Sequence, residues 1–148
     1  MNTTRPTALI ADDEPLLRNA LTRMLAQTWP ELEIVAEARN GREAVEQYQA
    51  LKPTVCFLDV HMPGMTGIEA ARQMVRGVHL VFVTAYSEYA VEAFSQGALD
   101  YLVKPLDPKR LEKTLQRVVQ SAEAAQQHED TANYLPEQHG LLLKFGEL

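Results

Sequence analysis

The chain has 148 residues, of which 46% are hydrophobic and 23% are charged, and its net charge at neutral pH is −6. This balance is typical of a folded protein with one ordinary α/β domain and an extension, and it excludes a largely disordered chain. The negative charge, with basic residues scattered, argues against direct binding to a nucleic-acid backbone.

The single cysteine, Cys56, lies inside an apolar run, so we expect a buried thiol and no intrachain disulfide. The first six residues lack the apolar segment of a secretory signal, and no stretch is apolar for long enough to cross a bilayer. These features predict a protein of the reducing cytoplasm without membrane insertion.

Five apolar runs alternate with segments of helical spacing, which is typical of βα units and a parallel sheet. The runs predict strands at about residues 7–11, 33–37, 54–59, 79–84 and 99–103. The fold class is therefore predicted to be α/β, with five strands and five helices.

Start signals place the first two helices. The first has Pro15 near its start, where a missing N–H is tolerated, and is predicted to point Arg18 outward. The second begins at Asn40, a good N-cap residue with Glu43 three positions later. Its predicted inward face consists of Ala44, Val45, Tyr48 and Leu51.

The remaining helices follow loops or turn residues. The third follows the loop 63–67 and is predicted to carry Ile68, Ala71 and Val75 inward. The fourth covers about residues 87–96, and the fifth starts at Asp107-Pro108.

Chemically active side chains end four of the predicted strands. Asp12-Asp13 follows the first strand, Asp59 ends the third, Thr84 ends the fourth and Lys104 follows the fifth. A strand buried on both faces reads as a continuous apolar run, so these residues mark the carboxyl edge of a parallel sheet, where ligands bind. Three carboxylates and one ammonium gathered there would be too costly to keep without a cation.

Oxygen ligands of this kind predict a Mg²⁺ site. Asp13 and Asp59 suit direct coordination, and Asp12 is expected to act through a bound water. The backbone carbonyl of His61, two residues past Asp59, completes the predicted shell.

The same residues predict phosphoryl chemistry. With the metal neutralising its neighbours, Asp59 is the predicted nucleophile toward phosphorus, giving an acyl phosphate. Lys104 supplies a point charge for the phosphoryl oxygens and Thr84 a hydroxyl donor, because phosphoryl transfer mostly needs positioning and charge stabilisation.

Each residue also has a simpler interpretation. Residues 12–14 could form an acidic first helical turn, Lys104 could be a solvated lysine, Thr84 a strand residue chosen for β propensity, and His61 an exposed loop histidine. The combination of four chemically complementary residues at four strand ends indicates a functional site much more specifically than any one of these residues does alone.

Two rival classes lack their motifs. A hydrolase of the haloacid-dehalogenase type needs Asp-x-Asp, which Asp59-Val60-His61 does not provide. A nucleotide-binding switch needs a Gly-rich loop ending in Gly-Lys-Ser/Thr, and the sequence has none.

Over residues 7–120 the chain resembles the receiver domains of two-component response regulators. The resemblance rests on Asp12-Asp13, the segment 56–67 around Asp59, Thr84-Ala85 and Lys104-Pro105. It implies a doubly wound, flavodoxin-like fold and Mg²⁺-dependent phosphoryl transfer from a sensor histidine kinase to Asp59. It also implies slow self-catalysed dephosphorylation, no enzymatic action on other substrates, and a cis Lys104-Pro105 bond. The alternative is an interaction module with the same fold that is never phosphorylated.

Segments 82–94 and 98–106 resemble the LytTR-output branch of this family, whose members carry a C-terminal DNA-binding domain. DNA binding is thus expected only through a domain missing from this chain. The predicted division is a receiver domain at 1–122, a polar linker or helix extension at 123–139, and at 140–148 either the start of a truncated output domain or a natural end.

The resemblance also suggests how the signal leaves the site. Phosphorylation is expected to draw Thr84 toward the phosphoryl oxygens, so that Tyr101 turns into the vacated space. The fourth helix, fifth strand and fifth helix then change and support a homodimer. A half-buried strand aromatic without a signalling part is the simpler interpretation of Tyr101.

Overall fold

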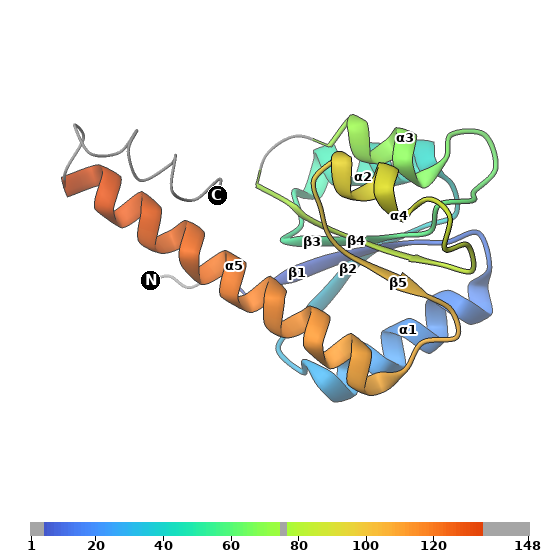
Figure 1. The fold of residues 1–148 in the computed structure, drawn as a ribbon, viewed down its shortest axis with the longest axis horizontal. Helices are drawn as coiled ribbons and strands as arrows, with labels where there is room; N and C mark the ends of the chain where they lie inside the picture. Colours follow the sequence, from blue (N-terminus) through green and yellow to red (C-terminus); the bar gives the residue numbers. More distant parts are fainter. Residues whose placement is uncertain (1–4, 75–76, 135–148) are drawn as a thin grey trace. The chain divides into compact units, whose positions relative to one another are not determined.

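Five parallel strands form one sheet in the order β2-β1-β3-β4-β5 (Figure 1). The computed structural model describes residues 5–74 and 77–134. The strands are β1 (Thr7–Ala11), β2 (Glu33–Ala38), β3 (Val55–Leu58), β4 (His79–Thr84) and β5 (Ala98–Val103). All five predicted strands are present, and their ends differ from the predictions by one residue at most.

Five helices connect and follow the strands. They are α1 (Pro15–Thr28), α2 (Gly41–Leu51), α3 (Gly67–Arg72), α4 (Ala90–Ser95) and α5 (Pro108–Tyr134). Helices α2, α3 and α4 cover one face of the sheet, and α1 with residues 108–114 of α5 lies on the other (Figure 1). The predicted doubly wound, flavodoxin-like α/β fold is confirmed.

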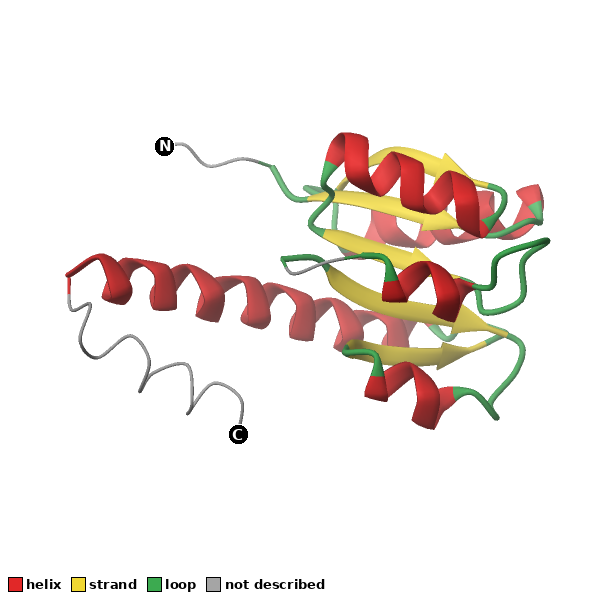
Figure 2. Ribbon diagram, turned by 90° about the horizontal axis from the view of Figure 1, so that it is seen from above, coloured by secondary structure: helices red, strands yellow, loops and turns green. Residues whose placement is uncertain are grey.

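The central strands are buried along their whole length, as their apolar sequences predict. Every residue of β3, and residues 8–11 of β1, is at most 1% exposed. Alternate side chains serve the two faces: Leu9 and Cys56 belong to the core cluster under α2, α3 and α4. All strands run in the same direction, so their carboxyl ends share one edge of the sheet (Figure 2).

Local side-chain bonds start two of the helices. The Asn40 side chain accepts a hydrogen bond from the Glu43 amide, as predicted for an N-cap. Thr66 and Glu69 form a reciprocal capping box at the start of α3, which fixes the loop that follows Asp59.

Three details of the helices differ from the predictions. Leu51 is 50% exposed instead of buried, because it is the last residue of α2, before Lys52 (φ 48°) turns the chain. Arg18 does not point outward: its side chain is only 13% exposed and pairs with Glu37 at 3.1 Å. Helix α4 is shorter than predicted, and Val75 lies outside the described residues.

The chain divides into two units, residues 1–114 and 115–148. The first contains the sheet, helices α1 to α4 and the start of α5. In the second, the described residues are all helical, since α5 continues to Tyr134 through residues rich in Ala, Gln and Glu, which favour helix. Helix therefore covers residues 123–134 of the predicted linker or helix extension, and the predicted segment 140–148 lies outside the described residues. The predicted domain boundaries stay a prediction.

A buried carboxylate joins β5 to the start of α5. Asp100 is 1% exposed and accepts hydrogen bonds from both terminal nitrogens of Arg110, at 2.8 and 2.7 Å, and from the Thr114 hydroxyl at 2.7 Å. Burial alone would raise the pKa of Asp100, but the hydrogen bonds from Arg110, Thr114 and the Tyr101 amide lower it to about 2.

We expect Arg110→Met to lower the free energy of unfolding at pH 7 by about 2 kcal/mol, because it leaves the Asp100 charge poorly compensated. The loss is smaller than for a fully buried pair, since the Arg110 side chain is 41% exposed. Because the pKa of Asp100 is lowered in the folded state, its ionised form stabilises the fold at pH values above the unfolded-state pKa. The difference in unfolding free energy between wild type and variant should therefore shrink as pH falls toward about 2.

Urea unfolding at pH 7 and pH 3 measures this difference. The matched control is Arg42→Met, which removes an arginine whose side chain is 82% exposed and should change stability by less than about 0.5 kcal/mol. Equal losses in the two variants would contradict a special role for the Asp100 pair.

Candidate functional site

The register of the sheet brings the predicted site residues to one edge. Ala11 of β1 pairs with Leu58 of β3, so the residues that follow, Asp12 and Asp59, leave the sheet side by side. Thr84 pairs with Val103, and the Lys104 amide donates to the Thr84 carbonyl at 2.8 Å. The strand ends therefore place Lys104 beside both carboxylates.

The Lys104 ammonium bridges two buried carboxylates. Its Nζ lies 2.7 Å from Oδ2 of Asp12 and 3.1 Å from Oδ2 of Asp59. The lysine side chain is 16% exposed and each aspartate side chain 8%, so both ion pairs are largely shielded from water. The predicted contact between Lys104 and the candidate nucleophile is present in the structure.

Backbone amides hold the remaining carboxylate oxygens. Oδ1 of Asp12 accepts from the Glu14 amide at 3.0 Å, and Oδ1 of Asp59 accepts from the His61 amide at 3.3 Å. Arg18 donates to the Asp12 carbonyl at 2.6 Å, which adds a basic group from α1 at the end of β1. The two carboxylates are thus oriented before any ligand arrives.

An acidic cluster lies at the end of β1. Within the described residues, carboxylate oxygens of Asp12, Asp13 and Glu14 lie within 4.8 Å of one another. Such oxygens suit a hard cation like Mg²⁺, so the donor set fits the predicted metal. Asp13 and Glu14 are exposed, whereas Asp12 is buried. The sequence analysis did not assign a ligand role to Glu14, although its place after two aspartates was the available signal.

Burial and charge act in opposite directions on Asp59. Burial raises its pKa, the Lys104 charge and the Thr84 hydroxyl lower it, and the net pKa lies above the ordinary value. Burial also lowers the pKa of Lys104, but the Asp12 hydrogen bond and the Asp59 charge outweigh it, so that pKa is raised. The lysine is therefore charged at neutral pH.

The raised pKa makes ionised Asp59 a destabilising group at neutral pH. The protonated form of Asp59 is the one that the folded state favours. Its contribution to stability is complete below the unfolded-state pKa and is lost as pH rises through the folded-state pKa. We therefore expect Asp59→Asn, in EDTA, to raise the free energy of unfolding at pH 7 by about 1 kcal/mol, and this gain to vanish below about pH 4.

Urea titrations at pH 7 and pH 3.5 test this sign. Asp107→Asn is the control, because Asp107 accepts from the Arg110 amide near the start of α5 and asparagine caps helices equally well. A less stable Asp59→Asn variant at pH 7 would mean that the ion pair with Lys104 outweighs the burial of the carboxylate.

Thr84 and Tyr101, the predicted switch residues, are both buried. Thr84 is fully buried, and its hydroxyl accepts from the Tyr86 amide at 3.4 Å. Tyr101 is 8% exposed and its hydroxyl donates to the Tyr86 carbonyl. The loop after β4 thus bonds to both residues through Tyr86, and the predicted switch stays a prediction.

Two tyrosine rings lie next to the ring of His61, in the loop that follows Asp59. The ring of His61 lies 4.2 Å from that of Tyr86 and 5.2 Å from that of Tyr89, measured between centroids. The His61 side chain is exposed, and its ring meets these two rings in tilted and edge-on contacts. Its backbone carbonyl stays the predicted metal ligand. The Lys104-Pro105 peptide bond is cis, as the resemblance implied.

Comparison with known families decides the identity of this fold and site. A model of the response regulator receiver domain matches residues 8–116. The chain belongs to the response regulator receiver family. The receiver assignment made from the strand-end motifs is thereby confirmed, and the protein is a receiver domain of a two-component response regulator.

Curated relatives extend beyond the receiver. The receiver is 50% identical over 117 residues to an uncharacterized response regulatory protein of Vibrio cholerae, covering 77% of this chain and 45% of that protein. It is 45% identical over 114 residues to the transcriptional regulatory protein BtsR of Escherichia coli, covering 76% and 47%. The chain thus spans about half the length of the curated relatives it matches.

Solved receiver structures have the same fold. The REC domain of AraT from Geobacillus stearothermophilus matches with a TM-score of 0.76 and 34% identity, covering 83% of this chain and 99% of that one. The response regulatory domain of MrkE from Klebsiella pneumoniae matches with a TM-score of 0.73 and 31% identity, covering 79% and 98%. Within the residues that the structure describes, no helix is long and apolar enough to span a membrane.

Proposed function

We propose that this receiver accepts a phosphoryl group from a sensor histidine kinase on Asp59, with Mg²⁺ at the adjoining acidic cluster. The observation that carries the proposal is the Lys104 ammonium within 3.1 Å of Asp59 and 2.7 Å of Asp12 at one edge of the sheet. Receiver domains as a family bind Mg²⁺ at this acidic pocket and receive phosphoryl groups from histidine kinases.

A solved relative supports the metal. The CheX–CheY complex from Borrelia burgdorferi was crystallised with BeF₃ and Mg²⁺, and its matched chain is 26% identical to this receiver, with a TM-score of 0.69 over 78% of this chain and 88% of that one. Here Asp12, Asp13 and Asp59 would hold the ion, with the His61 carbonyl. When bound, Mg²⁺ supplies positive charge to the oxygens around phosphorus.

The chain's own residues do the rest of the proposed chemistry. A carboxylate oxygen of Asp59 forms the new O–P bond as the N–P bond of the kinase phosphohistidine breaks, and the electron pair of that bond returns to the imidazole. Lys104 lies beside the reacting carboxylate and balances the added charge. The buried Thr84 hydroxyl lowers the pKa of Asp59, and in this proposal it donates to a phosphoryl oxygen.

We further propose that the protein catalyses only its own phosphorylation and dephosphorylation. Its output would be exerted through a LytTR-type DNA-binding domain in a longer protein. In this proposal phosphorylation changes the α4-β5-α5 face and favours a homodimer. Val91, Phe94 and Val103 of α4 and β5 are 83%, 48% and 44% exposed, which leaves apolar surface for such a contact.

The test is phosphorylation with a small phosphodonor. After incubation with Mg²⁺ and phosphoramidate, the intact mass is expected to rise by one phosphoryl group, and excess EDTA should prevent the gain. Asp59→Asn should gain nothing, whereas Asp107→Asn should gain as wild type does. No mass gain in the folded wild type would instead favour the alternative of an unphosphorylated interaction module.

A further inference from the structure

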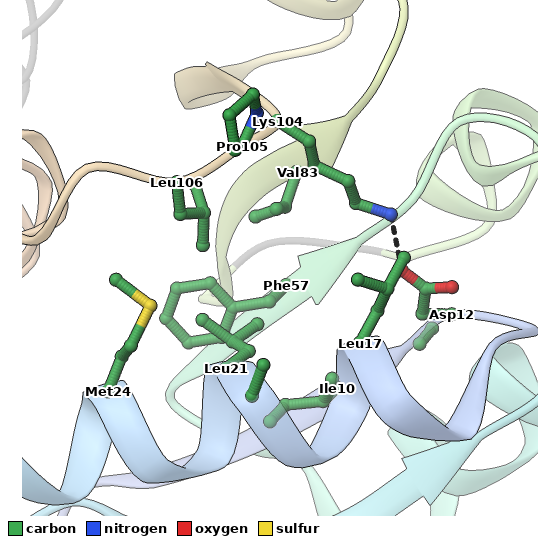
Figure 3. A pocket seen from close by; sticks show the side chains of 12 residues that line it. Ile10, Asp12, Leu17, Leu21, Met24, Phe57, Val83, Lys104, Pro105 and Leu106 are labelled. Atoms are coloured by element: carbon green, nitrogen blue, oxygen red, sulfur yellow. Dashed lines mark hydrogen bonds and ion pairs between the residues drawn. The ribbon is translucent and has the colours of Figure 1, made fainter.

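A pocket of about 240 Å³ lies beside the ion-pair cluster, on the face of the sheet that carries α1 (Figure 3). Helix α1 contributes Leu17, Leu21 and Met24 to its wall, and Leu21 lies beside the ring of Phe57 of β3 (Figure 3). The pocket adjoins the acidic cluster at the end of β1, where the metal is proposed, because Asp12 belongs to both.

The opposite wall is the segment that follows β5. Lys104, Pro105 and Leu106 line the pocket together with Val83 of β4. Figure 3 shows the Lys104 side chain extending along this wall, with its Nζ directed at Asp12. Lys104 is therefore shared between the pocket and the site around Asp59.

The residues that line the pocket determine which ligand charge it can accept. Of the twelve lining residues only Asp12 and Lys104 are charged, and they are paired with each other at 2.7 Å. A ligand carboxylate would have to displace Asp12 from Lys104, and a ligand ammonium would have to displace Lys104 from Asp12. A neutral apolar molecule needs neither change.

The volume is large enough for such a molecule. Protein interiors are close-packed and contain few voids larger than one water. An apolar cavity of about 150 Å³ stays dry and binds benzene. The pocket here, at about 240 Å³, has room for a ring of that size with a short substituent.

We propose that this pocket binds a small neutral apolar molecule of about the size of a substituted benzene, in contact with the side chain of Lys104. Neither the receiver chemistry nor the family comparison assigns a ligand to this position. Because Lys104 reaches both Asp12 and Asp59, a molecule in the pocket changes the surroundings of the lysine that pairs with the candidate phosphoacceptor.

The probe is fluorobenzene, followed by ¹⁹F NMR and by methyl shifts of the protein. We expect saturable binding with a dissociation constant of about 0.1–1 mM, and shifts at Leu21, Met24 and Leu106 but not at exposed Val91. The ionic probe 4-fluorobenzoate, which has the same ring and a carboxylate, should bind at least about tenfold more weakly.

Two leucine variants on α1 separate the pocket from the surface. Ala20 lines the pocket and Ala26 on the same helix is exposed, so Ala20→Leu should weaken fluorobenzene binding at least about tenfold and Ala26→Leu should not. If Ala20→Leu fails to fold, the methyl shifts of the wild type decide. No saturable binding, shifts away from the pocket, or equal binding of 4-fluorobenzoate would overturn the proposal.

Discussion

Lys104→Met is expected to lower the free energy of unfolding in EDTA by about 3 kcal/mol. Methionine preserves the length of the side chain but leaves Asp12 and Asp59 facing each other without the cation that now lies 2.7 and 3.1 Å away. Removing one partner of a buried ion pair leaves an uncompensated charge, which is more costly than the pair was favourable. Part of the loss is offset because Asp59 can take up a proton.

Mg²⁺ should rescue this variant more than it stabilises the wild type. Without the lysine charge the cluster is more negative, so a cation that binds only the folded state gains affinity and adds stability by mass action. We expect millimolar Mg²⁺ to recover about half of the loss or more. Urea unfolding with and without Mg²⁺ measures both effects.

The pH dependence of this effect has a definite sign. The pKa of Lys104 is raised in the folded state, so its stabilising contribution is complete below the unfolded-state pKa and is lost as pH rises through the raised one. The difference between wild type and variant should therefore diminish at strongly alkaline pH. Lys109→Met, at an exposed position of α5, is the control and should change little. A Lys104→Met variant as stable as wild type in EDTA would remove the charge argument for this site.

Gly67→Ala is expected to be the most disruptive single-methyl change in the molecule's candidate site. A Cβ at this position would press against the carbonyl group of Asp59, lying 2.8 Å from its carbon and 3.2 Å from Cα of Val60. Both are backbone atoms, so they cannot move aside as a flexible side chain could. We expect a loss of about 3–4 kcal/mol, the scale of overpacking in a well-packed interior, and a displaced phosphoacceptor loop.

Gly64→Ala in the same loop is the matched control. A Cβ on Gly64 would meet nothing within 4 Å, but its φ of +74° is unfavourable for alanine. The expected loss is about 1 kcal/mol, with the rate of Asp59 phosphorylation little changed. Thermal unfolding and phosphorylation kinetics of both variants compare a steric effect with a conformational one. Similar behaviour of the two would mean that the approach of α3 to Asp59 is not tightly packed.

The strand ends were predictable because strands buried on both faces of a parallel sheet have continuous apolar sequences. Once β1 and β3 were recognised, Asp12 and Asp59 had to emerge at the same edge, and the observed pairing of Ala11 with Leu58 follows that logic. Lys104 was predicted from the same reasoning. The helix start at Asn40 was equally visible, since capping depends on residues only three positions apart.

Contacts between distant segments were not predictable in this way. The bond of Arg110 to Asp100 depends on how α5 follows β5, and no local pattern distinguishes this arginine from a solvated one. The same holds for Arg18, whose burial reflects its bond to the Asp12 carbonyl. The contact of Gly67 with the Asp59 backbone is invisible in sequence, because an absent side chain leaves no pattern.

The alkylation rate of the single cysteine, Cys56, reports how often the sheet opens. Cys56 lies in the middle of β3, is fully buried, and burial raises its pKa to about 12, so its thiol is unreactive while the strand stays covered. Alkylation of Cys56 should then proceed only through openings that expose the central strand, three residues from Asp59. A cysteine introduced on the surface could therefore be labelled with a fluorophore while Cys56 stays unlabelled. In the same sample, the slow alkylation rate of Cys56 would measure how often β3 becomes exposed.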